Sequence, residues 1–443
     1  MKRWFIFSVL GLCTIAFGVL LIVKAHPVTF LFNLVWDLLS WIADVIPPTA
    51  SGVIAICLGA FFLVFAFFQA GKQVLNLVAP DESSLIDALD RHHMEGKGIK
   101  IVAIGGGTGL SNMLRGLKSI SSNITAVVTV ADDGGSSGRL RESMDIVPPG
   151  DIRSCIAALA RDDEVITRLF QYRFDNNASA DLKGHSFGNL FLTGLVELGG
   201  SKNMADAVKN ACDILRTRGQ VLPVSNEPMY LKAEFSDGNI VSGESNITEA
   251  NGGKIVKMTC DAPAPTVLPD VLEAIAEADL IVFGPGSLYT SIIPNLLVPG
   301  MIKALKEAAA TKVYVCNVMT QPGETEGYSI SDHVAALIKH SDGENLFNYV
   351  VANDEAPNKT QREKYLEKNQ VPVELDEKKI NEMGVKLYTT NLLQKGNMVR
   401  HNFRRLTKAL LSIYKRDQRN QDKRRRRMRK KAIKSGFLAS DAA

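Results

Sequence analysis

The stretch ADDGGSSGRLR, residues 131–141, brings together side chains that bind ligands rather than fill a core. Two adjacent carboxylates are followed by glycines, two hydroxyls and two guanidinium groups. Carboxylates accept hydrogen bonds from sugar hydroxyls or bind Mg²⁺, and a guanidinium pairs bidentately with a phosphate. We therefore expect a ligand rich in hydroxyls and negative charge, with a solvated turn held by surface ion pairs as the alternative. The candidate ligand residues of this stretch are Asp132, Asp133, Ser136, Ser137 and Arg139.

Two glycine-rich stretches, GGGTG at 105–109 and GPGS at 284–287, would leave backbone N–H groups open to a phosphate at a helix start. The first is not a complete G-x-G-x-x-G motif, because Leu110 stands where the last glycine would be, and it is not a P-loop, since no lysine follows. A tight turn without a ligand is the alternative for both stretches. The candidate residues are Gly106, Gly107, Thr108, Gly109, Gly284, Gly286 and Ser287.

Two more stretches place polar side chains at predicted helix starts. In PPGDIRSC, Asp151 and Arg153 could contact a ligand, although helix capping explains Asp151 equally well. In KGHSFGN, the hydroxyl of Ser186 and the amide of Asn189 suit a sugar or a phosphate, and His185 is either a ligand contact or structural. No Ser-His-Asp order, H-E-x-x-H motif or reactive-cysteine setting is evident. The sequence thus favours nucleotide or phosphosugar binding over acid–base hydrolysis.

Short apolar runs predict the strands that must position these residues. The first two runs flank a segment with helical spacing, which makes a βαβ unit and hence a parallel sheet. Ligands bind beyond the carboxyl ends of such strands, so the polar tips are expected to share one rim of the sheet. The predicted strands are IKIVAI, ITAVVTV, DLIVF, KVYVC and NYVVA.

The segment 229–244 alternates in polarity and turns at Asp237-Gly238, which predicts a β-hairpin inserted in the α/β body. The predicted fold class is therefore α/β, a Rossmann-like, mostly parallel sheet with an inserted β-hairpin.

The N-terminal region is predicted to cross a membrane twice. Residues 4–23 form an uncharged run of about 30 Å as a helix, and residues 51–71 form a second such run. The flanking Lys2, Arg3 and Lys72 place both ends in the cytoplasm, which makes residues 1–72 a transmembrane hairpin. The segment between the two runs is expected to be an amphipathic helix in the outer interface. A cleaved signal peptide and a buried soluble hairpin are the alternatives.

Charge is spread unevenly along the 443 residues, whose formal net charge is only +4. Residues 401–443 contain 15 lysines and arginines but three aspartates, so the tail is strongly basic and the body mildly acidic. Beside a membrane anchor, the tail is expected to contact anionic lipid, with a disordered solubilising tail as the alternative. No nucleic acid is expected, because no aromatic residues interleave the charges between 415 and 434. Six widely spaced cysteines without a C-x-x-C pair argue against a zinc site or disulfides.

Six segments occur in an order that resembles the YvcK family, the gluconeogenesis factors, which are related to the 2-phospho-L-lactate transferase CofD. These segments are IVAIGGGTGLSNMLRGLK, VTVADDGGSSGRLR, PPGDIRSCIAAL, GHSFGNLFL, ADLIVFGPGSLYTSIIPNLLVPG and CNVMTQPGETEGYSISDHV, within residues 99–405. The resemblance implies a Rossmann-like, usually oligomeric protein that binds UDP-N-acetylglucosamine. It also implies support of cell shape and peptidoglycan precursor synthesis on gluconeogenic carbon. The family is not established as catalytic.

The resemblance also implies roles for individual residues. In the transferase branch the ADD acids serve a divalent metal and the diphosphate, so Asp132 and Asp133 are a candidate Mg²⁺ site. That branch lacks the GGSSGRLR continuation, which favours the YvcK branch for this chain. Tyr365 and Arg400 resemble the late family positions that close over the nucleotide sugar, one stacking on uracil and one pairing with the diphosphate. The hairpin and the basic tail have no counterpart in the soluble family pattern.

The sequence therefore predicts a transmembrane hairpin at 1–72, a linker at 73–98, a Rossmann-like domain at 99–405 and a basic tail at 406–443. The predicted function is a regulatory, non-catalytic UDP-sugar binder that requires no cofactor. It is expected to form homo-oligomers in the cell membrane with its main domain in the cytoplasm. A Mg²⁺-dependent transferase is the first alternative, and a nicotinamide-linked oxidoreductase is a weaker one.

Overall fold

The computed structural model divides the chain into two compact units, Met1–Asp90 and Arg91–Ala443. It describes residues 98–440 apart from 162–163, 176–177, 180, 201–202, 251–252, 262–264, 395 and 397–398, and scattered residues between 33 and 65. The predicted hairpin at 1–72 therefore lies largely outside the described residues. Among those that are described, no single helix is long and apolar enough to span a bilayer. One pair bent by 82°, Leu288–Leu297 and Met301–Glu307, passes on length and composition.

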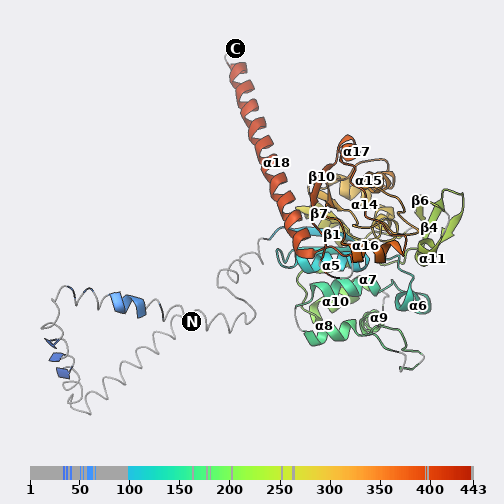
Figure 1. The fold of residues 1–443 in the computed structure, drawn as a ribbon, viewed down its shortest axis with the longest axis horizontal. Helices are drawn as coiled ribbons and strands as arrows, with labels where there is room; N and C mark the ends of the chain where they lie inside the picture. Colours follow the sequence, from blue (N-terminus) through green and yellow to red (C-terminus); the bar gives the residue numbers. More distant parts are fainter. Residues whose placement is uncertain are drawn as a thin grey trace. The chain divides into compact units, whose positions relative to one another are not determined.

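A seven-stranded sheet forms the centre of the second unit (Figure 1). Its order is β10-β9-β8-β7-β1-β2-β3, and every neighbouring pair is parallel. The strands are β1 (Ile101–Gly105), β2 (Ile124–Val128), β3 (Gln220–Pro223), β7 (Leu280–Phe283), β8 (Thr311–Val315), β9 (Tyr349–Asn353) and β10 (Lys386–Thr390). The α/β class and the Rossmann-like parallel sheet are confirmed.

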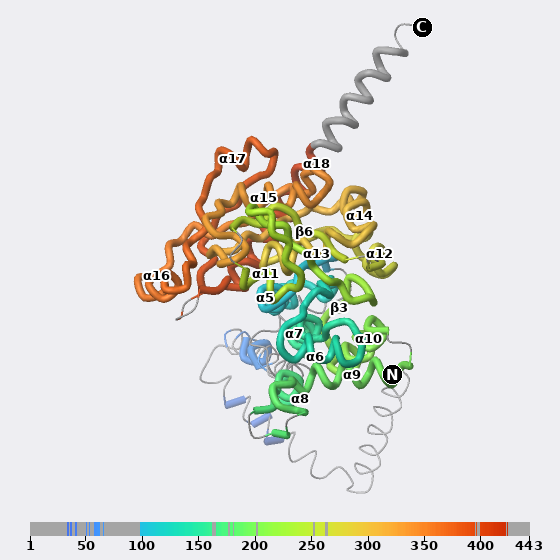
Figure 2. The backbone as a smooth tube through the Cα atoms, turned by 90° about the vertical axis from the view of Figure 1, so that its right-hand side faces the viewer, coloured from blue at the N-terminus to red at the C-terminus, as the bar shows by residue number. Residues whose placement is uncertain are grey.

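The central strands are buried along their whole length because helices cover both faces of the sheet. Their near-continuous apolar sequences, such as IVAIG and LIVF, have the composition that burial on both faces requires. The helices α7 and α10 contact β3, whereas α17 contacts β10 and α15 at the other end of the strand order, and α14 packs beside α12 (Figures 1 and 2). The sheet thus joins two halves around β1 and β7.

The described helices of this unit complete the fold. They are α5 (Gly107–Leu117), α6 (Gly135–Met144), α7 (Gly150–Leu159), α8 (Glu164–Gln171), α9 (Phe187–Gly199), α10 (Met204–Ile214), α11 (Glu244–Glu249), α12 (Pro269–Glu277), the π-helix η1 (Leu288–Ile292), α13 (Ile293–Leu297), α14 (Met301–Glu307), α15 (Ile330–Lys339), α16 (Lys359–Leu366), α17 (Glu377–Glu382) and α18 (Phe403–Ser440).

A small antiparallel sheet follows β3 and confirms the predicted hairpin. It has the order β5-β4-β6, with β4 (Leu231–Phe235), β5 (Ile240–Ser242) and β6 (Ile255–Cys260). The turn contains Gly238 at φ +86°, and the Asn239 N–H donates to Asp237 Oδ1 over 2.9 Å. The sequence prediction missed the third strand, β6, and the edge strands β3 and β10.

The helix α18 crosses the boundary at 405/406 that the sequence predicted between the domain and its tail. Its first turns belong to the core, since Leu406, Leu410 and Ile413 are fully buried. Gly116 of α5 allows this close contact, because a Cβ there would lie 2.3 Å from Thr407 Oγ1. The basic segment therefore continues a helix that is anchored in the domain.

Candidate ligand-binding site

A cavity of about 600 Å³ lies beyond the carboxyl ends of β1 and β7. These neighbouring strands are the point at which the strand order reverses, because β2 and β3 follow on one side and β8 to β10 on the other. In open α/β sheets, ligands bind in the crevice at this topological switch point. The predicted residues that line the cavity are Gly106, Gly107, Thr108, Gly109, Asp132, Asp151, Gly286, Ser287, Tyr365 and Arg400.

The glycines after β1 allow close contacts between protein groups. The Gly107 N–H donates to Asp151 Oδ2 over 2.6 Å, so this carboxylate occupies a backbone donor that we expected a phosphate to use. A Cβ at Gly109 would lie 2.2 Å from the carbonyl oxygen of Pro285. These glycines therefore bring α7 and the loop after β7 against the start of α5. Gly284 does not line the cavity, and its N–H donates to the Ile104 carbonyl within the β1–β7 pairing.

Three carboxylates, Asp132, Asp151 and Glu244, line the cavity. Burial raises the pKa of Asp151 to about 6, and the negative charge of Asp132 adds to the shift. Burial also raises the pKa of Glu244 to about 9, followed by the charges of Asp132 and Asp151. Glu244 begins α11 and comes from the inserted small sheet. The sequence prediction missed it, because only the folded insertion brings it to the rim.

Asp133 contacts the inserted small sheet. Its Oδ1 accepts hydrogen bonds from the Ser245 N–H over 2.9 Å and from the Ser245 hydroxyl over 2.6 Å, and it does not line the cavity. Of the two adjacent acids only Asp132 thus lines the cavity, and the Mg²⁺ site at this pair stays a prediction. Within the described part of the chain, no group of three or more His, Cys, Asp or Glu is arranged to hold a metal ion.

Positively charged side chains also line the cavity. Lys364, Lys368 and Arg400 line it, and all three are exposed at its mouth. The Tyr365 hydroxyl accepts from the Val399 N–H over 3.0 Å, which fastens α16 to the segment that carries Arg400. The sequence analysis selected Tyr365 and Arg400 but missed the two lysines, of which Lys364 lies on α16 and Lys368 follows the end of this helix.

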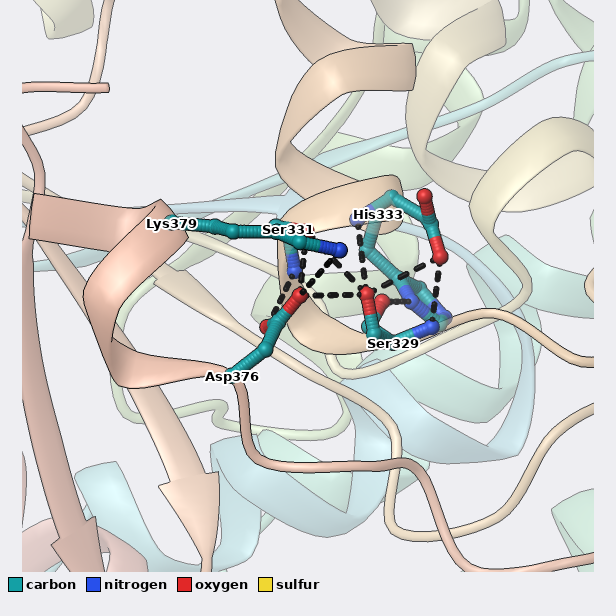
Figure 3. A network of polar contacts seen from close by, with 6 residues as sticks. Ser329, Ser331, His333, Asp376 and Lys379 are labelled. Carbon is teal, nitrogen blue, oxygen red and sulfur yellow. Dashed lines mark hydrogen bonds and ion pairs between the residues drawn. The ribbon is translucent and has the colours of Figure 1, made fainter. Parts of the chain in front are cut away.

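A hydrogen-bond network around Asp376 holds the end of the segment that follows α16 (Figure 3). Asp376 accepts hydrogen bonds from Ser329 Oγ over 2.7 Å, from the Ser331 N–H over 3.0 Å and from the Ser331 hydroxyl. Burial raises the pKa of Asp376, but the hydrogen bonds from Ser331 and Ser329 outweigh it and hold the pKa below its usual range. This network ties the start of α17 to the start of α15, next to the segment after α16.

A hydrogen-bonded chain orients the hydroxyl of Ser287. Asn317 Nδ2 donates to Gln321 Oε1 over 3.0 Å, and Gln321 Nε2 donates to Ser287 Oγ over 2.8 Å. Because Ser287 Oγ already accepts, its hydrogen is free to donate to a ligand. Glu324 braces the same loop, since its carboxylate accepts from the Tyr289 N–H and from Thr290 Oγ1. Burial raises the pKa of Glu324 to about 7.

The remaining predicted residues lie away from the cavity, mainly between α6 and α9. Ser136 Oγ lies 3.0 Å from His185 Nδ1 and accepts from Asn189 Nδ2 over 3.0 Å. Ser186 caps α9 by accepting from the Asn189 N–H. The residues of this second group that do not line the cavity are Ser136, Ser137, Arg139, Arg153, His185, Ser186 and Asn189. Ser137 Oγ accepts from the Gly150 N–H and joins α6 to α7.

A family model described as 2-phospho-L-lactate transferase CofD matches residues 101–393, which is more than half of the chain. The chain belongs to the CofD family. The matched range contains the complete seven-stranded sheet and all three acids of the cavity.

Several CofD-family relatives are named gluconeogenesis factors. The one from Halalkalibacterium halodurans is 46% identical over 313 residues, 70% of this chain and 95% of the relative. The one from Bacillus subtilis is 44% identical over 317 residues, 71% of this chain and 98% of the relative. A Nostoc sp. relative is 44% identical over 416 residues, 93% of this chain and 90% of its own. The predicted resemblance to the YvcK family is confirmed.

A crystal structure of a Bacillus halodurans protein is similar to this CofD-family chain at 45% sequence identity. Its TM-score is 0.68, and it covers 71% of this chain and 100% of its own. The fold of the central domain is thus shared with an experimentally solved relative.

Proposed function

We propose that this chain is a regulatory protein that binds a UDP-sugar, UDP-N-acetylglucosamine, in the cavity beyond β1 and β7. The observation that carries the proposal is that groups of both charges line this cavity. Asp132, Asp151 and Glu244 line it together with Arg400, Lys364 and Lys368. A nucleotide sugar has a doubly charged diphosphate in its middle and hydroxyls at its sugar end, so it presents a partner for the cations and for the acids.

Each part of a UDP-sugar has chemically suitable partners among the residues of the cavity. Arg400 and Lys364 suit the diphosphate, because charge-assisted hydrogen bonds to phosphate are stronger than neutral ones. The carboxylates suit sugar hydroxyls, and the Tyr365 ring suits stacking on uracil. The Ser287 hydroxyl has a hydrogen to donate beside the loop after β7. A volume of about 600 Å³ falls in the usual range for small-molecule sites.

Titration calorimetry of the full chain with UDP-N-acetylglucosamine tests this proposal. We expect saturable binding that weakens about tenfold in Lys364→Ala, because one phosphate contact is removed. Lys359→Ala is the matched control, since this lysine lies on the same helix with a side chain 90% exposed and does not line the cavity. Absence of binding with and without Mg²⁺ would reject the proposal.

The alternative function is a Mg²⁺-dependent transferase like the one that names the family model. The negative charge of Asp132, Asp151 and Glu244 favours it, because burial and, after it, mutual repulsion raise the pKa of Asp151 and Glu244, and a Mg²⁺ ion that enters with a diphosphate would compensate this charge. Slow consumption of a nucleotide donor that requires Mg²⁺ and is lost in Asp132→Asn would support it. Binding without turnover in the presence of Mg²⁺ would favour the regulatory role.

We further propose that residues 1–72 anchor the protein in the cell membrane, with the main domain in the cytoplasm as a homo-oligomer, and that it supports cell shape and peptidoglycan precursor supply. The geometry of α18 supports a membrane-facing basic tail. Asp417 of α18 accepts hydrogen bonds from Thr311 and Tyr349, the first residues of β8 and β9. The helix α18 therefore packs at the amino ends of these strands, whereas the cavity lies at the carboxyl ends, so the basic tail would leave the ligand site open to the cytoplasm.

Two measurements test the membrane assignment. Full-length protein should resist extraction from membranes by carbonate, and release into the supernatant would contradict the anchor. Deletion of 415–434 should weaken binding to vesicles that contain anionic lipid while UDP-sugar affinity stays unchanged. Equal vesicle binding with and without this segment would contradict the lipid role.

A further inference from the structure

Three arginines, Arg139, Arg153 and Arg173, lie close together between α6, α7 and α9. None of them forms a salt bridge in the part of the chain that the structure describes. Like charges held together raise the energy of a fold, so such a group is typical of a site that awaits an anion.

Two of the guanidinium groups flank one exposed turn. Arg139 Nη2 donates to the Lys183 carbonyl over 2.9 Å, and Arg173 Nη1 donates to the next carbonyl, that of Gly184, over 2.5 Å. Gly184 has φ +78°, and a Cβ there would lie 3.3 Å from Arg139 Nη2. Each guanidinium has five N–H donors, so most donors of both groups remain for a ligand.

Arg153 approaches the same turn from inside the fold. Its side chain packs on Gly188 at the start of α9, where a Cβ would lie 2.9 Å from Arg153 Cγ. Its Nε is buried and has no hydrogen-bond partner. Burial lowers the pKa of Arg153, and the positive charge of Arg173 lowers it further. Arg153 also interacts electrostatically with Asp151 and Asp132, which line the cavity, so the arginine group lies next to the cavity.

The polar residues beside the arginines add no negative charge. Burial lowers the pKa of His185, and Arg139 and Arg173 lower it further, so its imidazole is neutral at pH 7. Asn189 is 2% exposed, and its Oδ1 has no partner although its Nδ2 binds Ser136. Ser136 lies in the first turn of α6, whose N-cap Gly134 supplies no side-chain hydrogen bond.

We propose that Arg139, Arg153 and Arg173 form a second ligand site that binds a phosphate group, either inorganic phosphate or a small phosphate monoester. A phosphate brings up to two negative charges and oxygens in several directions, which suits three guanidinium groups approaching from different elements better than a single carboxylate does. The exposed positions of Arg139 and Arg173 leave room for the organic part of an ester. The site is separate from the proposed UDP-sugar cavity and does not depend on it.

Equilibrium dialysis of the full chain against labelled inorganic phosphate, at constant ionic strength in sodium chloride, tests the site. We expect saturable binding of one phosphate per chain. The double variant Arg139→Gln/Arg173→Gln should weaken it at least tenfold. Arg161→Gln, an exposed arginine just after α7, is the matched control and should leave it unchanged. Displacement by glycerol phosphate would assign the site to esters, and its failure would assign the site to the free ion.

Two further results separate this site from the cavity. Lys364→Ala should leave phosphate binding unchanged, since Lys364 lines only the cavity. UDP-N-acetylglucosamine should not displace the phosphate. Non-saturable binding, equal binding by the double variant, or loss of phosphate binding in Lys364→Ala would overturn the proposal, whatever the outcome of the UDP-sugar titration.

Discussion

The cavity beyond β1 and β7 and the arginine group between α6 and α9 differ in how their charge is balanced. The cavity combines acids from α7, α11 and the loop after β2 with cations from α16, the residues just after it and the segment before α18. The arginine group combines cations with neutral polar groups, and Arg153 also interacts electrostatically with Asp151 and Asp132. A surface with both signs suits a ligand with an anionic centre and hydroxyl-rich ends, whereas a surface of one sign suits a small anion.

This difference arises within a single stretch of sequence. Asp132 lies at the end of the strand region and lines the cavity. Four residues later, α6 has begun, and it directs Ser136 and Arg139 toward His185 and Lys183 on the α9 side. The motif ADDGGSSGRLR thus contributes to two regions, because a strand end and a helix face point their side chains in different directions.

Arg400→Ala is expected to have the largest effect, and it tests whether the cavity and the arginine group bind their ligands independently. Removal of a guanidinium at the mouth of the cavity should weaken UDP-N-acetylglucosamine binding about 100-fold, because a charge-assisted phosphate contact is lost. Inorganic phosphate binding at the arginine group should be unchanged. Calorimetry and dialysis on the same preparation check both results. A parallel loss of both affinities would show that the two regions act as one site.

The acids of the cavity should destabilise the unliganded protein at alkaline pH. The folded-state pKa values of Asp151 and Glu244, about 6 and about 9, lie above their ordinary values of 3.8 and 4.5. As the pH rises through this window, the unfolded chain releases these protons first, so the free energy of unfolding falls. Glu244→Gln should therefore stabilise the protein at pH 8 by about 1 to 2 kcal/mol, allowing for water in the open cavity.

Urea denaturation at several pH values measures this effect. Glu244→Gln should flatten the pH dependence, whereas Glu249→Gln, an exposed residue of the same helix, should leave it as in the parent chain. A parent chain whose stability rises between pH 6 and pH 9 would contradict the assignment of raised pKa values.

The smallest effect is expected from Asp376→Asn, in the segment that follows α16. Asp376→Asn keeps the shape of the side chain but removes an acceptor for Ser331, so it should lower the free energy of unfolding by about 1 kcal/mol. UDP-sugar affinity should fall by about threefold, because Gln370 in the cavity lies on the anchored segment. Phosphate binding at the arginine group and the exposed control Lys378→Ala should show no change. Unchanged UDP-sugar affinity in Asp376→Asn would mean that the network does not position the cavity wall.

Much of the central sheet could be predicted from the sequence because buried parallel strands are short, continuous apolar runs. The five predicted strands correspond to β1, β2, β7, β8 and β9. The edge strands are less apolar, and β10, KLYTT, is exposed or half-buried along its length. The strand β6 was missed because its partner β4 comes before a helix, so local patterning gives no sign of the pairing.

Residue spacing predicted members of the candidate site mainly where they directly follow a strand that ends at the cavity. Gly107, Asp132 and Gly286 come after β1, β2 and β7, which are neighbours in the sheet, and all three line the cavity. Glu244, Gln321 and Lys364 were missed, because they come from an insertion, a loop after β8 and an exposed helix. Their convergence depends on strand order and on long-range hydrogen bonds, such as that between Gln321 and Ser287, which sequence spacing does not encode.

A structure determined with UDP-N-acetylglucosamine bound tests the central claim most directly. We predict density for the nucleotide sugar beyond β1 and β7, with the diphosphate within hydrogen-bond distance of Arg400 and the uracil against Tyr365. Density for the diphosphate between Arg139 and Arg173, with an empty cavity at the switch point, would contradict the account.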